Sequence, residues 1–203
     1  MRFVASFRMI SSLRALELAI AHGDVREVDL LLDAEPDLIA VQFPENVGLT
    51  PLMWACRNRH ASIVELLLDK GADVNAVNPL AENGDGGNTA LWFAAQGAFP
   101  GATPIARLLL DHGAPIDVPG ESGTTPFFMA VVWVHMELVQ FFLSRGANPL
   151  LGNAEGKTPL QAVRDQYERL QGQEKKTEEI KRLGFRAPRM ISFLEKLTNG
   201  HSH

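Results

Sequence analysis

Apolar residues along this chain gather in blocks that recur every 33 to 39 residues. Within each block, apolar positions three or four residues apart predict two short helices that bury one face each. The second helix of each block contains a run of large apolar side chains, at residues 30–32, 66–68, 108–110 and 141–143. The pattern therefore predicts a series of similar helix pairs.

Every block after the first opens with the same kind of tripeptide. A threonine is followed by proline or alanine and then by leucine or phenylalanine, starting at Thr50, Thr89, Thr125 and Thr158. Threonine caps a helix, and proline is tolerated in the first helical turn. Glycines two residues earlier suit a turn with positive φ, and those after the second helix suit its C-terminal end. Small residues share a further offset where helices must approach closely, namely Ala19, Ala55, Ala94 and Ala130.

A period near 33 residues with this content resembles the ankyrin repeat. The resemblance covers roughly residues 13–198 and rests on four aligned blocks. It implies an all-α solenoid of stacked helix-turn-helix units, with projecting β-turn fingers and a binding surface on the concave side. We expect one domain with repeats at about 13–47, 48–86, 87–122, 123–155 and 156–198, an N-terminal extension at 1–12 and a tail at 199–203.

Both ends of the array are expected to be atypical, because a terminal repeat has one face in water. In the first repeat Arg14 replaces the threonine, and the helix is expected to begin directly after it. Residues 1–12 are expected to cover this end as a turn or helix rather than to act as a targeting segment. In the last repeat, residues 165–181 predict a charged inserted helix, and a final amphipathic helix is expected after Gly184 and Pro188.

Two insertions interrupt the repeats. Residues 76–88 are rich in glycine and asparagine and predict either a tolerated loop or an extended finger that touches a partner. Residues 96–102 separate the helices of the third repeat, after which Thr103 is expected to cap the next helix and Phe99 is expected to pack across the turn.

The residue after each tripeptide departs from the ankyrin pattern, which usually has histidine there. The four positions are Met53, Trp92, Phe128 and Gln161. Bulky side chains at a fixed helical offset either pack in the core or form the apolar floor of a groove. Trp133 falls at an offset that faces the concave groove in ankyrin repeats, so it either anchors a partner or covers a gap between repeats.

Composition narrows the function classes. The 203 residues include one cysteine, Cys56, which we expect to be a buried thiol and which favours a reducing, cytoplasmic location. No apolar run approaches the length of a membrane span. The net charge of −5, with acids at the finger positions such as Glu45 and Glu155, disfavours nucleic acid. A partner with basic or apolar character is more natural.

The sequence contains no nucleophile and base pair and no metal-ligand spacing, so we expect no enzyme activity, cofactor or metal. His60 and His135 occupy equivalent repeat positions and are expected to be structural. We predict a monomeric protein-interaction scaffold that binds a partner protein through the concave groove of repeats 2–4. The predicted contacts are Met53, Arg57, Asn58, Asp85, Asn88, Trp92, Gln96, Glu121, Thr124 and Trp133.

An alternative is that the chain is a substrate or regulatory subunit of another enzyme. Asn75, within the sequence Gly-Ala-Asp-Val-Asn, resembles the ankyrin asparagine that can be hydroxylated.

Overall fold

The computed structural model describes residues 2–46, 48–79, 86–97, 100–171 and 178–199, with side chains described from residue 10 and outside 178–185. The chain divides into two compact units. Unit 1 comprises Met1–Ala94 with Pro104–Pro115, and unit 2 comprises Ala95–Thr103 with Ile116–His203. The regular elements of the described residues are helices, accompanied by two isolated antiparallel bridges, Phe43 with Leu49 and Val77 with Thr89. The fold is therefore all-α.

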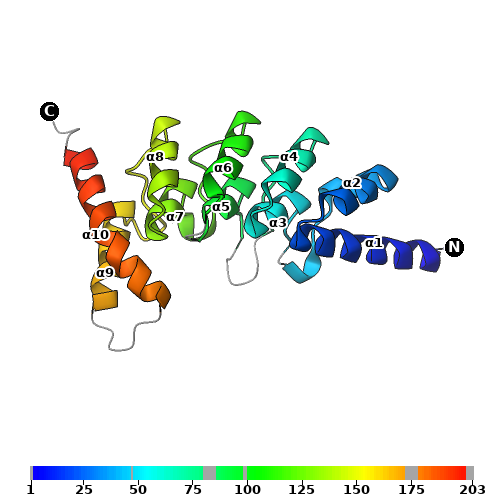
Figure 1. Ribbon diagram of the computed structural model, residues 1–203, viewed down its shortest axis with the longest axis horizontal. Helices are drawn as coiled ribbons and strands as arrows, with labels where there is room; N and C mark the ends of the chain where they lie inside the picture. The colour runs from blue at the N-terminus through cyan, green and yellow to red at the C-terminus, as the bar shows by residue number, and fades with distance from the viewer. Residues whose placement is uncertain (1, 47, 80–85, 98–99, 172–177, 200–203) are drawn as a thin grey trace. The chain divides into compact units, whose positions relative to one another are not determined.

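Unit 1 contains the first two helix pairs and most of the third. Its elements are α1 (Arg2–His22), α2 (Val25–Ala34), η1 (Pro36–Ala40), η2 (Pro44–Asn46), α3 (Pro51–Asn58), α4 (Ala61–Asp69), and most of α5 (Ala90–Ala95) and α6 (Ala102–Asp111). Helix α1 packs against α2 and α3, and α4 packs against α2 and α3 (Figure 1). The first two pairs thus stack first helix on first helix and second helix on second helix.

Unit 2 continues with the same kind of pair. Its elements are η3 (Glu121–Gly123), α7 (Pro126–Val132), α8 (Met136–Ser144), α9 (Pro159–Gln171) and α10 (Glu178–Asn199). Helix α7 packs against α8 and α9, and α9 packs against α10 (Figure 1). No helix in the described part of the chain has the length and apolar content needed to cross a membrane.

Local chemistry forms the helix starts as predicted. The Thr50 hydroxyl oxygen accepts a hydrogen bond from the backbone N–H of Met53 at 3.3 Å, and Pro51 occupies the first turn of α3. The Thr125 hydroxyl accepts from the N–H of Phe128 at 3.1 Å in the same way. Gly123 has φ +71°, and a Cβ there would lie 2.7 Å from the backbone nitrogen of Ala154. This glycine is therefore required for the two neighbouring turns to meet.

The core consists of the apolar positions that repeat in sequence. The four small residues at the shared offset, Ala19, Ala55, Ala94 and Ala130, are all buried, as predicted. Complete burial also raises the pKa of the Cys56 thiol, with Arg59 opposing that shift. Cys56 is therefore a neutral core residue, and the prediction of a buried thiol is confirmed.

The prediction of a helix start after Arg14 is wrong. Helix α1 runs without a break from Arg2 to His22, because this stretch has neither glycine nor proline to end it. Arg14 lies on its surface and donates hydrogen bonds to the Glu45 carboxylate at 2.6 Å and the Glu17 carboxylate at 3.2 Å. The N-terminal cap is thus one long helix.

The prediction that Thr103 caps a helix is also wrong. Helix α6 begins at Ala102, one residue earlier, so Thr103 lies inside the first turn. Its hydroxyl oxygen is buried and has no hydrogen-bond partner among the described residues. Phe99, which was expected to pack nearby, lies outside the described residues.

The predicted break around Gly184 and Pro188 does not occur either. Both residues lie inside α10, which is continuous from Glu178 to Asn199. Proline removes one helical hydrogen bond, but Met190 and Leu194 beyond it are fully buried. Packing of α10 against α9 therefore overrides the local helix-breaking signal.

Candidate functional site

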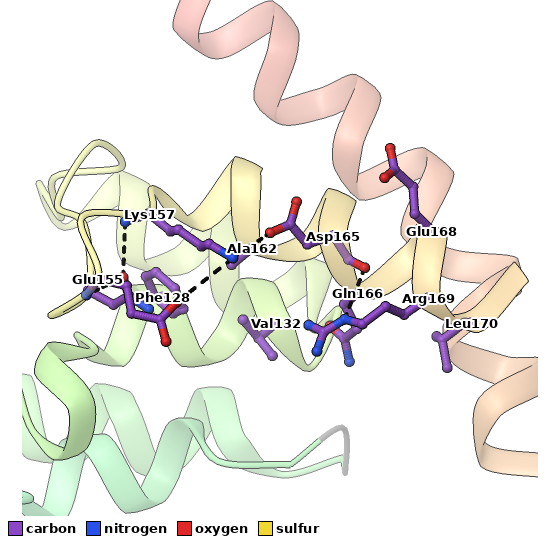
Figure 2. Close-up of a pocket in the computed structure, with 11 residues that line it drawn as sticks. Phe128, Val132, Glu155, Lys157, Ala162, Asp165, Gln166, Glu168, Arg169 and Leu170 are labelled. Atoms are coloured by element: carbon purple, nitrogen blue, oxygen red, sulfur yellow. Dashed lines mark hydrogen bonds and ion pairs between the residues drawn. The ribbon is translucent and has the colours of Figure 1, made fainter. Parts of the chain in front are cut away.

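Unit 2 contains a surface hollow of about 940 Å³ between α7, α9 and the turn at residues 153–157. We call it the α7–α9 pocket and the turn the 153–157 finger. The volume falls within the roughly 300–1,000 Å³ of typical ligand pockets. Figure 2 shows Glu155 and Lys157 at the finger end, Gln166, Arg169 and Leu170 towards the other end, and Val132 between them.

Asn153 fixes the shape of the 153–157 finger. Its side-chain oxygen accepts hydrogen bonds from the backbone N–H groups of Glu155 at 3.1 Å and Lys157 at 3.0 Å. Its backbone N–H donates to the carbonyl oxygen of Lys157 at 3.0 Å, and Ala154 donates to the carbonyl of Ser122 at 2.8 Å. The finger is therefore held both internally and against the preceding turn, which places Glu155 and Lys157 at the mouth of the pocket.

An ion pair connects the finger to α9. The Lys157 ammonium lies 2.7 Å from a carboxylate oxygen of Asp165 and 3.8 Å from one of Glu155 (Figure 2). The hydrogen bond from Lys157 lowers the pKa of Asp165, and the same bond raises the pKa of Lys157. Lys157 and Asp165 therefore neutralise one another over the ordinary pH range, whereas the Glu155 side chain is 72% exposed.

The floor of the pocket is apolar. Phe128 is 4% exposed at its base, and Val132, Ala162 and Leu170 also line it. Ala162 follows Thr158 by four residues, and its methyl group leaves space that a larger side chain at this offset would fill. The hollow thus arises from a small residue on α9 opposite α7.

The far end of the pocket is basic and contains an amide. The Arg169 Nε donates to the carbonyl oxygen of Asp165 at 3.2 Å, and the guanidinium lines the pocket. The Gln166 side-chain oxygen is buried and has no hydrogen-bond partner among the described residues. With Glu168 at the rim, the lining side chains contain three carboxylates and two cations. The pocket therefore combines an apolar floor with an acidic end and a basic end.

Four of the predicted partner contacts are buried. Met53 is 0% exposed, Trp92 and Asn88 are 3% exposed, and Thr124 is 8% exposed. The Trp92 ring meets Phe93 edge to face at 5.3 Å between centroids. Phe128, at the equivalent position of the fourth repeat, is also buried. At Met53 and Trp92 the bulky side chains therefore pack in the core and do not form the floor of a groove. Their predicted role as anchors does not fit the structure, because a partner cannot reach them.

Asn88 instead shapes the base of the finger at 76–88. Its backbone N–H donates to the side-chain oxygen of Asn78 at 2.8 Å, and its carbonyl accepts from the N–H of Asn78 at 3.1 Å. Asp85, another predicted contact, lies outside the described residues. Asn75 is exposed, with its backbone N–H donating to Asp73 at 2.9 Å, and its modification stays a prediction.

In unit 1, two predicted contacts lie beside a tryptophan. The exposed Arg57 guanidinium lies 5.8 Å from the Trp54 ring centroid, within cation–π range. Asn58 is partly buried and donates from its side chain to the Trp54 carbonyl at 2.8 Å. The Trp54 indole N–H donates to the Glu17 carbonyl on α1 at 3.1 Å. These residues give unit 1 a polar and aromatic surface.

In unit 2, Gln96, Glu121 and Trp133 are partly exposed. The Glu121 carbonyl accepts a hydrogen bond from the Thr124 hydroxyl at 2.7 Å, which stabilises the turn formed by η3. Trp133 ends α7, and its indole N–H is buried without a hydrogen-bond partner among the described residues. Both earlier alternatives for Trp133, a partner anchor and a gap cover, fit a half-buried ring.

The pocket residues were missed because the equivalent positions were traced through only part of the chain. Val132 lies seven residues after its repeat threonine, as do Arg57 and Gln96. The same offset in the fifth repeat gives Asp165, and the next residue is Gln166. Extending the alignment by one repeat was therefore enough to find two pocket residues.

The histidines have structural partners. His135 Nδ1 accepts from the backbone N–H of Leu138 at 3.3 Å, and His60 Nε2 lies 3.2 Å from the Ala21 carbonyl. Among residues whose side chains the structure describes, no three His, Cys, Asp or Glu side chains are grouped to hold a metal ion.

Comparisons with known proteins agree with the fold. Residues 8–78 and 76–153 match the family described as ankyrin repeats (3 copies). Ankyrin repeat and KH domain-containing protein 1 from Homo sapiens is 42% identical over 112 residues, which are 55% of this chain and 4% of that protein. Ankyrin repeat and KH domain-containing protein mask-1 from Caenorhabditis elegans is 31% identical over 149 residues, 73% of this chain and 5% of that protein.

A third relative, the tyrosine-protein kinase HTK16 from Hydra vulgaris, is 31% identical over 137 residues, 66% of this chain and 16% of that protein. The chain thus spans a small fraction of each of these relatives. Because the family match extends over more than half of the residues and coincides with the stacked helix pairs, this chain belongs to the ankyrin-repeat family.

Proposed function

We propose that this chain is a non-catalytic, monomeric protein-interaction module that binds a partner protein through the surface formed by the first helices and fingers of its repeats. One observation carries the proposal: the α7–α9 pocket opens between two first helices and a finger, and it pairs an apolar floor with charged side chains. Ankyrin repeats generally mediate protein–protein interaction, and this pocket has the composition of a recognition site.

The exposed residues of the other repeats are proposed contacts as well. Arg57 and Asn58 in unit 1, and Gln96, Glu121 and Trp133 in unit 2, remain from the predicted set after the buried residues are removed. Tryptophan and arginine are enriched among residues that dominate binding energy. The partner surface is expected to be basic or apolar, in keeping with the net charge of −5.

Support for a non-catalytic role comes from the polar groups themselves. Cys56 is buried with a raised pKa, and His60 and His135 contact backbone groups. The ion pair between Lys157 and Asp165 at the pocket, with side chains 44% and 42% exposed, consists of groups that hold each other in their charged forms. A carboxylate that acts as a general base, or a lysine that acts as a nucleophile, needs a pKa shifted towards neutral pH, whereas this pairing shifts both pKa values away from it.

The test is affinity capture from cells of the native host with the purified chain as bait, followed by reconstitution of each captured candidate with recombinant protein. We expect a candidate to bind the wild-type chain directly in calorimetry. A Trp133→Ala/Arg57→Glu variant is expected to bind it at least about tenfold more weakly, which corresponds to about 1.4 kcal/mol.

A matched control reverses a surface charge on a second helix and leaves the first helices unchanged. Glu65 is exposed on α4, so Glu65→Lys is expected to leave binding unchanged. Far-UV circular dichroism and melting curves must match among the variants. Equal binding by all of them would exclude Arg57 and Trp133 as contacts, and failure of every candidate to bind directly would contradict the interaction function.

A further inference from the structure

We propose that the α7–α9 pocket binds an extended segment of a partner protein with a fixed polarity: a lysine or arginine at the finger end, apolar residues over the floor, and an aspartate or glutamate at the Arg169 end. This inference rests on the proposed interaction function and specifies the ligand at one site.

The finger end of the pocket is expected to select a cation, because the Lys157 ammonium group at this end is already paired with carboxylates. Lys157 bridges Asp165 at 2.7 Å and Glu155 at 3.8 Å, and the shorter contact to Asp165 is the stronger pair. Glu155 is 72% exposed, and its carboxylate lies at the finger end of the pocket, where its contact with Lys157 is the longer of the two (Figure 2). Asn153 holds this turn in place through two backbone hydrogen bonds. A basic side chain of a partner would therefore meet a positioned carboxylate.

The opposite end has the reverse charge. Arg169 uses its Nε to bind the Asp165 carbonyl, and no ion pair joins its guanidinium to a carboxylate among the described side chains. Its terminal nitrogens are thus available to a carboxylate, which guanidinium binds through two parallel hydrogen bonds. Figure 2 shows Gln166 and Arg169 together at the end of the pocket away from Glu155.

The middle of the pocket fits an extended chain rather than a compact ion. Phe128, Val132 and Ala162 provide an apolar floor between the charged ends. The Gln166 side chain lies in the wall of the same stretch of the pocket (Figure 2). An extended peptide offers an N–H at every residue and advances about 3.3 Å per residue, so several residues span the pocket.

The experiment uses a phage-displayed library of random linear peptides selected on the full chain, with the selected sequences then synthesised and titrated by fluorescence polarisation. The expected consensus has a basic position and an acidic position separated by apolar residues. Glu155→Lys is expected to weaken these peptides at least about fivefold, and Arg169→Glu to do the same.

Charge reversal in the peptide separates the two ends. A peptide whose basic position is changed to glutamate is expected to recover affinity for Glu155→Lys but not for Arg169→Glu. The peptide with its acidic position changed to lysine is expected to do the converse. Val132→Ser tests the floor, and Glu137→Lys, on the exposed side of α8, is the control expected to change nothing.

Each other outcome overturns the inference in a recognisable way. Selected peptides whose binding is insensitive to the pocket variants would leave the interaction function standing and place binding elsewhere. A consensus with the opposite order of charges would exclude the proposed polarity. If no peptide is selected and the chain forms dimers that Glu155→Lys abolishes, a second copy occupies the pocket instead. If neither peptides nor dimers appear, the pocket takes no extended segment, while direct binding of captured candidates still decides the interaction function separately.

Discussion

Trp54 in unit 1 and Ala162 in unit 2 occupy the same place in their repeats, four residues after the capping threonine. Trp54 reaches from α3 to the preceding first helix, where its indole N–H donates to the Glu17 carbonyl. Ala162 on α9 has only a methyl group to direct towards α7, and the space beside it is the pocket. The same backbone position therefore closes the surface in one unit and opens it in the other.

The difference shows how a repeat fold separates its framework from its recognition surface. The residues that cap and pack the helices are shared among repeats, as Thr50 and Thr125 illustrate. The offsets that face outward from the first helices differ between repeats, as Trp54 and Ala162 do at the fourth position after the threonine. Function at such a site is expected to change through one or two side chains without a change in fold.

The largest expected effect on stability comes from removing the Trp54 side chain, which fills this repeat position in unit 1. Trp54→Ala deletes a half-buried indole, its hydrogen bond to Glu17 and the ring beneath Arg57, so the free energy of unfolding is expected to fall by roughly 2–3 kcal/mol. Urea denaturation measures it. Trp54→Phe, which retains a ring, is expected to lose about 1 kcal/mol. Equal losses for both variants would show that packing contributes nothing beyond the hydrogen bond.

Filling the α7–α9 pocket with a large side chain at position 162 is expected to affect peptide binding more than stability. Ala162→Trp places in the pocket the side chain that unit 1 already has, and peptides selected on the wild-type chain are expected to bind about tenfold more weakly. Fluorescence polarisation measures the affinity, and melting curves check the fold. Gln161→Trp introduces the same residue at the adjacent exposed position and serves as the control. Unchanged affinity for Ala162→Trp would mean that peptides do not enter the pocket.

A pair of threonines tests which parts of the framework hold the repeats. Thr125→Ala removes a helix cap and is expected to cost about 1 kcal/mol of unfolding free energy. Thr103→Val removes a buried hydroxyl that has no partner among the described residues and is expected to be neutral or slightly stabilising. Thermal denaturation of both variants measures these changes. A loss of stability for Thr103→Val would indicate that the Thr103 hydroxyl forms a hydrogen bond to a group outside the described residues.

Features set by local chemistry were the ones that the sequence predicted well. Thr50, Thr125 and Gly123 act through neighbours within a few residues or through a backbone angle, so their roles follow from residue type. Pro188 was misjudged because burial of Met190 and Leu194 against α9 outweighs one lost helical hydrogen bond. That balance depends on tertiary contacts that periodicity does not contain.

The candidate site was harder to predict for a different reason. Periodicity places Met53 and Trp92 on the first helices but does not distinguish the side that meets the next repeat from the side that meets solvent. The pocket depends on the small size of Ala162, and an alanine in a helix gives no signal of its own. The predicted contact residues included large aromatic side chains such as Trp92. The pocket instead lies where the repeat has a small residue, Ala162, in place of a large one.

The smallest expected effect concerns the ion pair that keeps the 153–157 finger beside α9. Pairing lowers the pKa of Asp165, so its contribution is present above the unfolded value of about 3.9 and is lost as pH falls through the folded value. Pairing raises the pKa of Lys157, so that contribution is present below about 10.4 and is lost as pH rises through the folded value. The finger is therefore expected to stay tethered from about pH 5 to 9.

Carbon-detected NMR of the Asp165 carboxyl group measures this directly. Its titration midpoint is expected to lie at a lower pH in the wild-type chain than in Lys157→Met, where the hydrogen-bond donor is gone. Lys70→Met is the matched control, because it removes a lysine that pairs with Asp29 and Asp33 in unit 1. Equal midpoints in the wild type and Lys157→Met would mean that the pair does not persist in solution. Lys157 would then pair with Glu155 alone, and Asp165 instead of Glu155 would be the carboxylate that a basic side chain of the partner meets at this end of the pocket.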